Sequence, residues 1–82
     1  MNDTTKIVTN DEERKGRYAN FTLASHRRSE FILDFIFVEP VEKGESAMLA
    51  HRVIMSPKSV KSMINVLNEN MEKYEKAFGE EA

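Results

Sequence analysis

An apolar block at residues 30–38, "EFILDFIFV", dictates the architecture of the chain more than any other segment. Its residues are aromatic or β-branched almost throughout, and Pro40 follows two positions later, so the block is too short for a stable buried helix and favours a central β-strand. One carboxylate, Asp34, lies in the middle of it. Because a charge on an apolar face needs a partner that offsets its desolvation, we expect a partner for Asp34 on a neighbouring strand.

Two further strands are predicted around this block. Residues 17–27 alternate between apolar and polar side chains, and residues 47–55, "AMLAHRVIM", form another β-favouring run. Between the second and third strands, residues 39–46, "EPVEKGES", combine proline, glycine and charge, which is typical of a loop. The three segments predict an antiparallel meander.

A long helix is predicted after the third strand. Ser56 can cap its first amides, Pro57 suits the first helical position, and Gly79 is a typical terminator. Apolar side chains recur at three- and four-residue steps, at Val60, Met63, Ile64, Leu67, Met71, Tyr74 and Phe78. The predicted fold class is therefore α+β, with a three-stranded antiparallel meander followed by one long C-terminal helix in a single domain at 17–80.

The first part of the chain, residues 1–16, is polar and charged, and we expect a disordered leader there. That leaves roughly 65 ordered residues, a size at which apolar burial barely exceeds the conformational entropy lost on folding. The chain has no cysteine, so neither disulfides nor zinc–thiolate sites are available to add stability. Oligomerisation is the leading alternative.

The setting predicted for the chain is the cytoplasm. No signal-peptide pattern is present, and no apolar run approaches the length that spans a bilayer. A net charge of −2 gives no overall electrostatic case for nucleic acid or an anionic membrane as a partner.

Strand registers can be proposed from the hairpins. A first hairpin that turns at 28–29, and a second that closes Val38 onto Ala47, place Asp34 opposite His51. We interpret Asp34 and His51 as a structural pair that fixes register. One sheet face then holds Phe21, Leu23, Ile32, Ile36, Leu49, Val53 and Met55. The other holds Tyr18, Thr22, Phe31, Leu33, Phe35, Phe37, Met48 and Ile54.

Both predicted faces are apolar, yet one helix covers only one of them. An exposed patch of this size is rare on monomers, so a homodimer is expected, formed either sheet on sheet or through edge-strand pairing plus helices. A different partner protein would satisfy the same argument. The predicted partner-binding residues on the aromatic face are Phe31, Leu33, Phe35 and Phe37.

Two chemical constellations are weighed against the structural pair. Ser25 shares a face with Asp34 and His51 in this register, which brings together the residue types of an acyl-transfer triad, but no glycine-framed nucleophile or oxyanion element accompanies them. A metal site from His26, His51 and Asp34 lacks recognised ligand spacing, and His26 falls on the opposite face. We therefore predict no catalytic residue, metal site or cofactor.

A basic patch supports an alternative function. Arg27 and Arg28 lie at the first turn, while Lys58 and Lys61 lie at the start of the helix, against the preference of the helix dipole for anions there. An acidic partner or a phosphate group would offset the unfavourable interaction between these lysines and the helix dipole. The combination of aromatic and basic side chains that is typical of nucleic-acid-binding surfaces is missing. The leading prediction is a non-enzymatic interaction or accessory module acting as a homodimer, and the alternative is a nucleic-acid-associated accessory protein.

Four short motifs carry a family resemblance: "YANF", then "SH" followed four residues later by "EFILDF", then "HRVIMSP", and finally "LNENMEKYEKAFG". They resemble a family of small bacterial and archaeal proteins catalogued as a domain of unknown function, whose members read Tyr-x-Asn, Ser-His-x-x-x-Glu-Phe-x-x-Asp-Phe, Arg-Ile-Val-x-(Ser/Thr)-Pro and x-x-Asn-x-x-x-Tyr-Glu. The matching positions are Tyr18, Asn20, His26, Glu30, Phe31, Asp34, Phe35, Arg52, Pro57, Asn70 and Tyr74. The chain departs from the pattern at Arg27-Arg28, where members often have a Ser-Pro turn, and in 39–46. The resemblance spans 17–80 and supports the architecture, with no activity to transfer.

Overall fold

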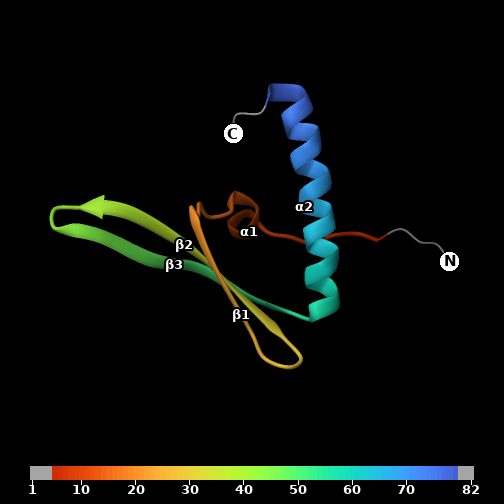
Figure 1. The fold of residues 1–82 in the computed structure, drawn as a ribbon, viewed down its shortest axis with the longest axis horizontal. Helices are drawn as coiled ribbons and strands as arrows, with labels where there is room; N and C mark the ends of the chain where they lie inside the picture. Colours follow the sequence, from red (N-terminus) through yellow and green to blue (C-terminus); the bar gives the residue numbers. More distant parts are fainter. Residues whose placement is uncertain (1–4, 80–82) are drawn as a thin grey trace.

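The computed structural model describes residues 5–79 as one sheet and two helices (Figure 1). The elements in order are α1 (Asp11–Lys15), β1 (Phe21–His26), β2 (Phe31–Val41), β3 (Gly44–Met55) and α2 (Pro57–Phe78). The strands form an antiparallel sheet in the order β1-β2-β3, and α2 follows directly. The predicted α+β meander with a C-terminal helix is confirmed.

The first hairpin has the predicted register. Leu23 lies opposite Asp34, and Phe21 lies opposite Ile36. The Arg27 amide donates to the Glu30 carbonyl oxygen at 2.8 Å, which closes the turn. β1 begins at Phe21, four residues later than predicted.

The second hairpin is longer than predicted. Residues 39–46 were expected to be a loop, but β2 runs to Val41 and β3 starts at Gly44, which leaves Glu42 and Lys43 as the turn. Pro40 is tolerated because β1 does not reach this part of β2, so the strand has a free edge for a residue without an N–H. Gly44 has φ +98°, a conformation that favours glycine in a tight turn.

A β-bulge in β3 changes the register beyond its midpoint. Phe35 lies opposite His51, whereas Ile36 lies opposite Leu49, so Ala50 is an extra residue on β3. Beyond the bulge every β3 residue is displaced by one position, and Asp34 lies opposite Arg52. The predicted pairing of Asp34 with His51 is therefore wrong, because it assumed an unbroken ladder.

α2 has the predicted ends. The Ser56 hydroxyl accepts from the Ser59 amide at 3.1 Å, with proline next in the chain. At the other end Gly79 has φ +89°, and its amide donates to the Glu75 carbonyl oxygen at 2.8 Å. Within the part of the chain that the structure describes, no helix has the length and apolar character required to cross a membrane.

The leader contains one helical turn, α1. The Asn10 side chain accepts from the Glu13 amide at 2.8 Å, and three acidic residues occupy the first turn, where the helix dipole favours them. The prediction of disorder over 1–16 is corrected for Asp11–Lys15. The start of that predicted leader, 1–4, and the end of the predicted domain, residue 80, lie outside the described residues.

The two sheet faces differ in how far the chain itself covers them. Leu33 on β2 and Val60 in the first turn of α2 are 6% and 8% exposed, and no other described residue is buried. The bulge places Val53 and Met55 on the same face as Leu33, and both are half-buried, whereas their neighbour Ile54 points to the other face and is 55% exposed. The start of α2 therefore covers the face of Leu33, which we call the helix-side face; the other is the open face.

The chain is extended for its size. Its Cα radius of gyration is 16.4 Å, against about 12 Å for a compact domain of this length. Its accessible surface is 7669 Å², against about 5,000 Å² for a folded monomer of this mass.

Candidate functional site

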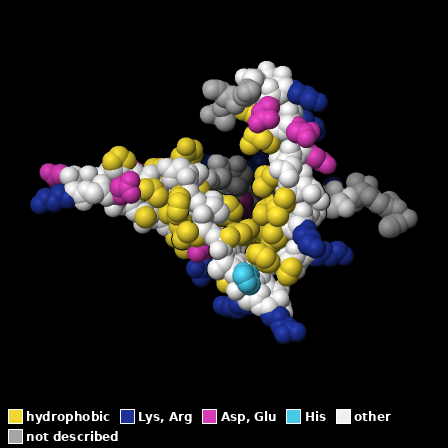
Figure 2. Space-filling model, viewed as in Figure 1, with side chains coloured by type: hydrophobic (Ala, Val, Ile, Leu, Met, Phe, Trp, Pro, Cys, Tyr) yellow, Lys and Arg dark blue, Asp and Glu magenta, His cyan; other side chains and the backbone are white. Residues whose placement is uncertain are grey.

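The first uncovered apolar surface lies along α2. Leu67 is 59% exposed and Phe78 is 73% exposed, in a helix whose apolar side chains follow one stripe. Figure 2 shows hydrophobic side chains continuing along α2 away from the sheet, and in Figure 1 no other helix or strand of residues 5–79 lies along this part of α2. We call this surface the helix stripe, and it consists of Ile64, Leu67, Met71, Tyr74 and Phe78.

The second uncovered surface is the open face of the sheet. Phe21, Leu23, Leu49 and Ile54 project from it, and each is about half exposed. Beside them lies a shallow groove of about 660 Å³, between β1 and the β2–β3 hairpin. Its lining residues are Asn20, Phe21, Leu23, Ile36, Val38, Glu45 and Ala47.

An ion pair occupies the middle of the open face. Arg52 donates to Asp34 through Nε at 2.6 Å and through Nη2 at 2.9 Å, a bidentate geometry that orients both side chains. The hydrogen bond from Arg52, together with its charge, lowers the pKa of Asp34 against the opposing effect of desolvation. The same pairing raises the pKa of Arg52. The cross-strand partner expected for Asp34 is therefore present, but it is Arg52 and not His51.

The residues of the acyl-transfer alternative do not meet. Asp34 lies on the open face with Ser25, while His51 lies opposite Phe35 on the helix-side face. His26 also lies on the helix-side face, so the residues of the predicted metal alternative are divided between the faces. Among residues 5–79, no three His, Cys, Asp or Glu side chains are grouped so that they could hold a metal ion.

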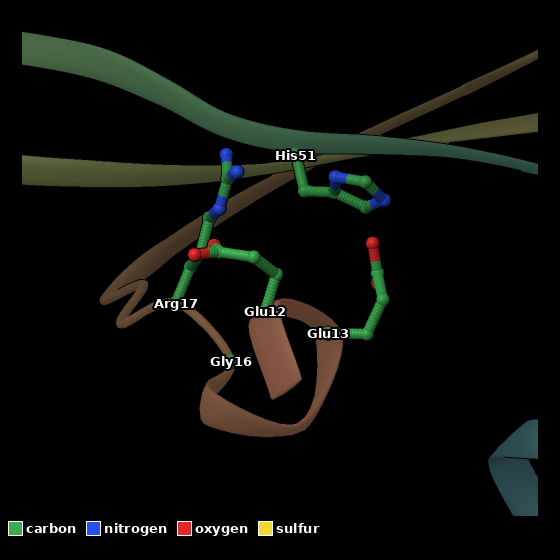
Figure 3. Close-up of a pocket in the computed structure, with 5 residues that line it drawn as sticks. All are labelled: Glu12, Glu13, Gly16, Arg17 and His51. Carbon is green, nitrogen blue, oxygen red and sulfur yellow. The ribbon is translucent and has the colours of Figure 1, made fainter. Parts of the chain in front are cut away.

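His51 instead borders a small polar pocket beneath α1. The pocket has a volume of about 240 Å³ and is lined by Glu12, Glu13, Gly16, Arg17 and His51. In Figure 3 the imidazole of His51 and the carboxylate of Glu13 point toward one another. Because His51 is on the helix-side face, the pocket places α1 on that side of the sheet.

The predicted aromatic partner surface lies on this helix-side face. Leu33 is buried within the chain, and Phe31, Phe35 and Phe37 are half-buried. Tyr18 meets Phe37 edge to face, with ring centroids 5.9 Å apart. The prediction that Leu33 contacts a partner is corrected, because α2 and its own strand neighbours already cover it.

The predicted basic residues gather at one end of the molecule. Phe31 pairs with both His26 and Met55, so the β1–β2 turn lies beside the start of α2. Arg27 and Arg28 in that turn, and Lys58 and Lys61 in α2, are all exposed. Arg27 also forms an exposed ion pair with Glu30 at 3.3 Å.

Two residues that hold the sheet together were not singled out for these roles by sequence reasoning. Arg17 donates to the carbonyl oxygen of Ala50, the extra residue of the bulge, at 3.0 Å. The side-chain amide of Asn20 accepts from the Val38 amide and donates to the Val38 carbonyl oxygen, both at 2.9 Å. The Asn20 side chain thus makes the two hydrogen bonds with Val38 that the backbone of a neighbouring strand would otherwise make. Its place in the "YANF" motif was a signal for it, whereas nothing in the sequence marks Arg17.

Comparison with known proteins identifies the family. Residues 1–80 match the family described as "Protein of unknown function (DUF3467)", and the chain therefore belongs to it. No curated protein and no solved structure matches the chain.

Proposed function

We propose that this member of the DUF3467 family is a non-enzymatic protein-interaction module of the cytoplasm that acts as a homodimer. The observation that carries the proposal is the amount of apolar surface that the chain leaves uncovered. Leu33 and Val60 are the only buried residues among those described, which is too small a core for a domain of this size. A second copy would cover one of the two apolar surfaces.

The second apolar surface supports binding of another protein. In a dimer that covers the helix stripe, the open face and its groove remain accessible. Half-exposed Phe21, Leu23 and Leu49 form the kind of apolar patch that marks interaction sites on soluble proteins. The buried centre of such an interface tolerates a charged pair when its hydrogen bonds are satisfied, as those of Asp34 and Arg52 are.

The non-enzymatic part of the proposal rests on the arrangement of reactive side chains. Asp34 is engaged by Arg52, and His51 lies on the opposite face. The groove on the open face is lined mainly by apolar side chains and backbone, with no general base next to a nucleophile.

The dimer is tested by multi-angle light scattering and sedimentation equilibrium over a range of concentrations. We expect twice the mass of the 9.5 kDa chain. A well-folded monomer at high micromolar concentration would contradict the proposal. For the second partner, affinity capture from the native host is compared between the unmodified chain and Leu49→Asp. A specific partner should be lost with Leu49→Asp and retained with Glu42→Ala, which changes the distant turn.

A second candidate function is supported by the clustering of Arg27, Arg28, Lys58 and Lys61 at one end. Such a cluster could bind the phosphates of a nucleic acid. Binding to DNA or RNA that weakens steeply with salt, and that is lost in the quadruple alanine variant, would favour this function. The double variant Lys73→Ala/Lys76→Ala is the matched control, because it removes charge from the other end of α2.

A further inference from the structure

We propose that α2 pairs with α2 of a second copy as a short antiparallel coiled coil. This inference rests on the homodimer proposed above and specifies its surface and orientation. The helix stripe continues a heptad pattern that begins at the buried Val60. Val60, Leu67 and Tyr74 are seven residues apart, and so are Ile64, Met71 and Phe78. Along the helix, positions of the two series alternate at intervals of four and three residues, which is the spacing of a two-stranded coiled-coil seam.

The far half of α2 needs such a partner. Val60 is buried by the sheet, but the side chains beyond it, from Ile64 to Phe78, are between 39% and 73% exposed where they are large and apolar. Most helical stability in proteins comes from packing an amphipathic face, and this part of α2 leaves its apolar face exposed. A second helix laid along the stripe would supply that packing.

The charges beside the stripe select the orientation. Lys61, Asn68 and Glu75 are spaced by seven residues, so they share one flank of the seam. In an antiparallel pair the same flank of both helices meets, and Lys61 of one copy then faces Glu75 of the other. Asn68, midway between them, faces its own copy at the two-fold axis. A parallel pair brings opposite flanks together and forms neither contact.

The distribution of charge along the helix agrees with this orientation. The first half of α2 carries Lys58 and Lys61 and no acidic residue, whereas the second half carries three glutamates and two lysines and is net negative. These residues are Glu69, Glu72, Lys73, Glu75 and Lys76. An antiparallel pair places the net positive half of each helix beside the net negative half of the other, and it also opposes the two helix dipoles. It provides Lys61 with an acidic partner, Glu75 of the second copy.

Cross-linking tests the orientation directly, because the chain contains no cysteine. Single variants Asn68→Cys, Lys61→Cys and Glu75→Cys are treated with a short bis-maleimide. We expect Asn68→Cys to cross-link to itself, and Lys61→Cys to cross-link to Glu75→Cys only when the two proteins are mixed. Ser62→Cys, on the outer side of the helix, is the matched control and should stay uncross-linked.

Charge reversal provides a second measurement. Lys61→Glu should raise the dimer dissociation constant by about tenfold, and the double variant Lys61→Glu/Glu75→Lys should restore it to within about threefold of the original. Cross-linking of Lys61→Cys to itself would show a parallel pair and overturn the inference. A dimer by light scattering in which none of the three helix cysteines cross-links would also overturn it while leaving the homodimer intact. A monomer by light scattering would instead remove the homodimer.

Discussion

Asp34 and Arg52 are joined by two hydrogen bonds between β2 and β3, of 2.6 and 2.9 Å. The Asp34 side chain is only 17% exposed, whereas that of Arg52 is 55% exposed, so the carboxylate depends on the pairing more than the guanidinium does. A slip of one residue in the register would replace Arg52 by His51 or Val53 and break both hydrogen bonds. The pair therefore helps to specify the register beyond the bulge.

The first prediction concerns the cost of removing this carboxylate. Asp34→Ala leaves the Arg52 guanidinium without its partner, so it should lower the melting temperature more than Glu42→Ala does. Glu42 is the matched control because it lies in the exposed β2–β3 turn. The double variant Asp34→Ala/Arg52→Ala should be less destabilised than the sum of the single variants. Equal melting temperatures for Asp34→Ala and Glu42→Ala would show that the pair contributes nothing to stability.

The second prediction is a pH dependence. Arg52 holds the pKa of Asp34 below its ordinary value of 3.8, so near that pH the unfolded chain binds more protons at this position than the native chain. The stabilisation by Asp34 is complete above the unfolded pKa and is lost as the pH falls through 3.8 toward the lower folded pKa. Asp34→Asn should reduce the pH dependence of the free energy of unfolding in this window. Urea unfolding at several pH values between pH 2.5 and pH 6 measures it. An unchanged slope in Asp34→Asn would contradict this prediction.

The sequence predicted the order and type of the main elements because the local signals agree with the final packing. The short basic turn at 28–29 fixes the first register, and the serine and proline at 56 and 57 define the start of α2. The bulge at Ala50 could not be predicted. Its stabilising contact comes from Arg17, 33 positions earlier. The apolar side chains of residues 47–55 can also be placed on a sheet face with or without the bulge, so their pattern does not select one register.

The candidate surfaces were predicted less well than the fold. Two apolar sheet faces follow from the sequence pattern, but the face that α2 covers depends on how the chain leaves β3. The bulge decides this by moving Val53 and Met55 to the side of Leu33. Predicted partner residues such as Leu33 consequently belong to the core, while Leu23 and Leu49 remain uncovered.

The third prediction concerns the small core. Leu33→Ala should reduce the free energy of unfolding by about 2–3 kcal/mol, because Leu33 is one of the two side chains that are buried among residues 5–79. Leu49→Ala makes the same chemical change on the open face, where the side chain is 53% exposed, and should cost less than about 1 kcal/mol. Urea unfolding of both variants at the same protein concentration measures the difference. A larger loss for Leu49→Ala would place the core on the other face of the sheet.

The fourth prediction concerns Asn20, whose side chain extends the pairing of β1 beside Val38. Asn20→Ala removes both hydrogen bonds and should cost about 1–2 kcal/mol, while Asn65→Ala, on α2, should cost less. Hydrogen exchange separates the two bonds. The Val38 amide donates to the Asn20 side-chain oxygen, so its exchange should accelerate in Asn20→Ala and stay slow in Asn20→Asp, which keeps that acceptor but cannot donate to the Val38 carbonyl. Unchanged exchange at Val38 in Asn20→Ala would mean that the backbone of β2 is protected at this position by another group.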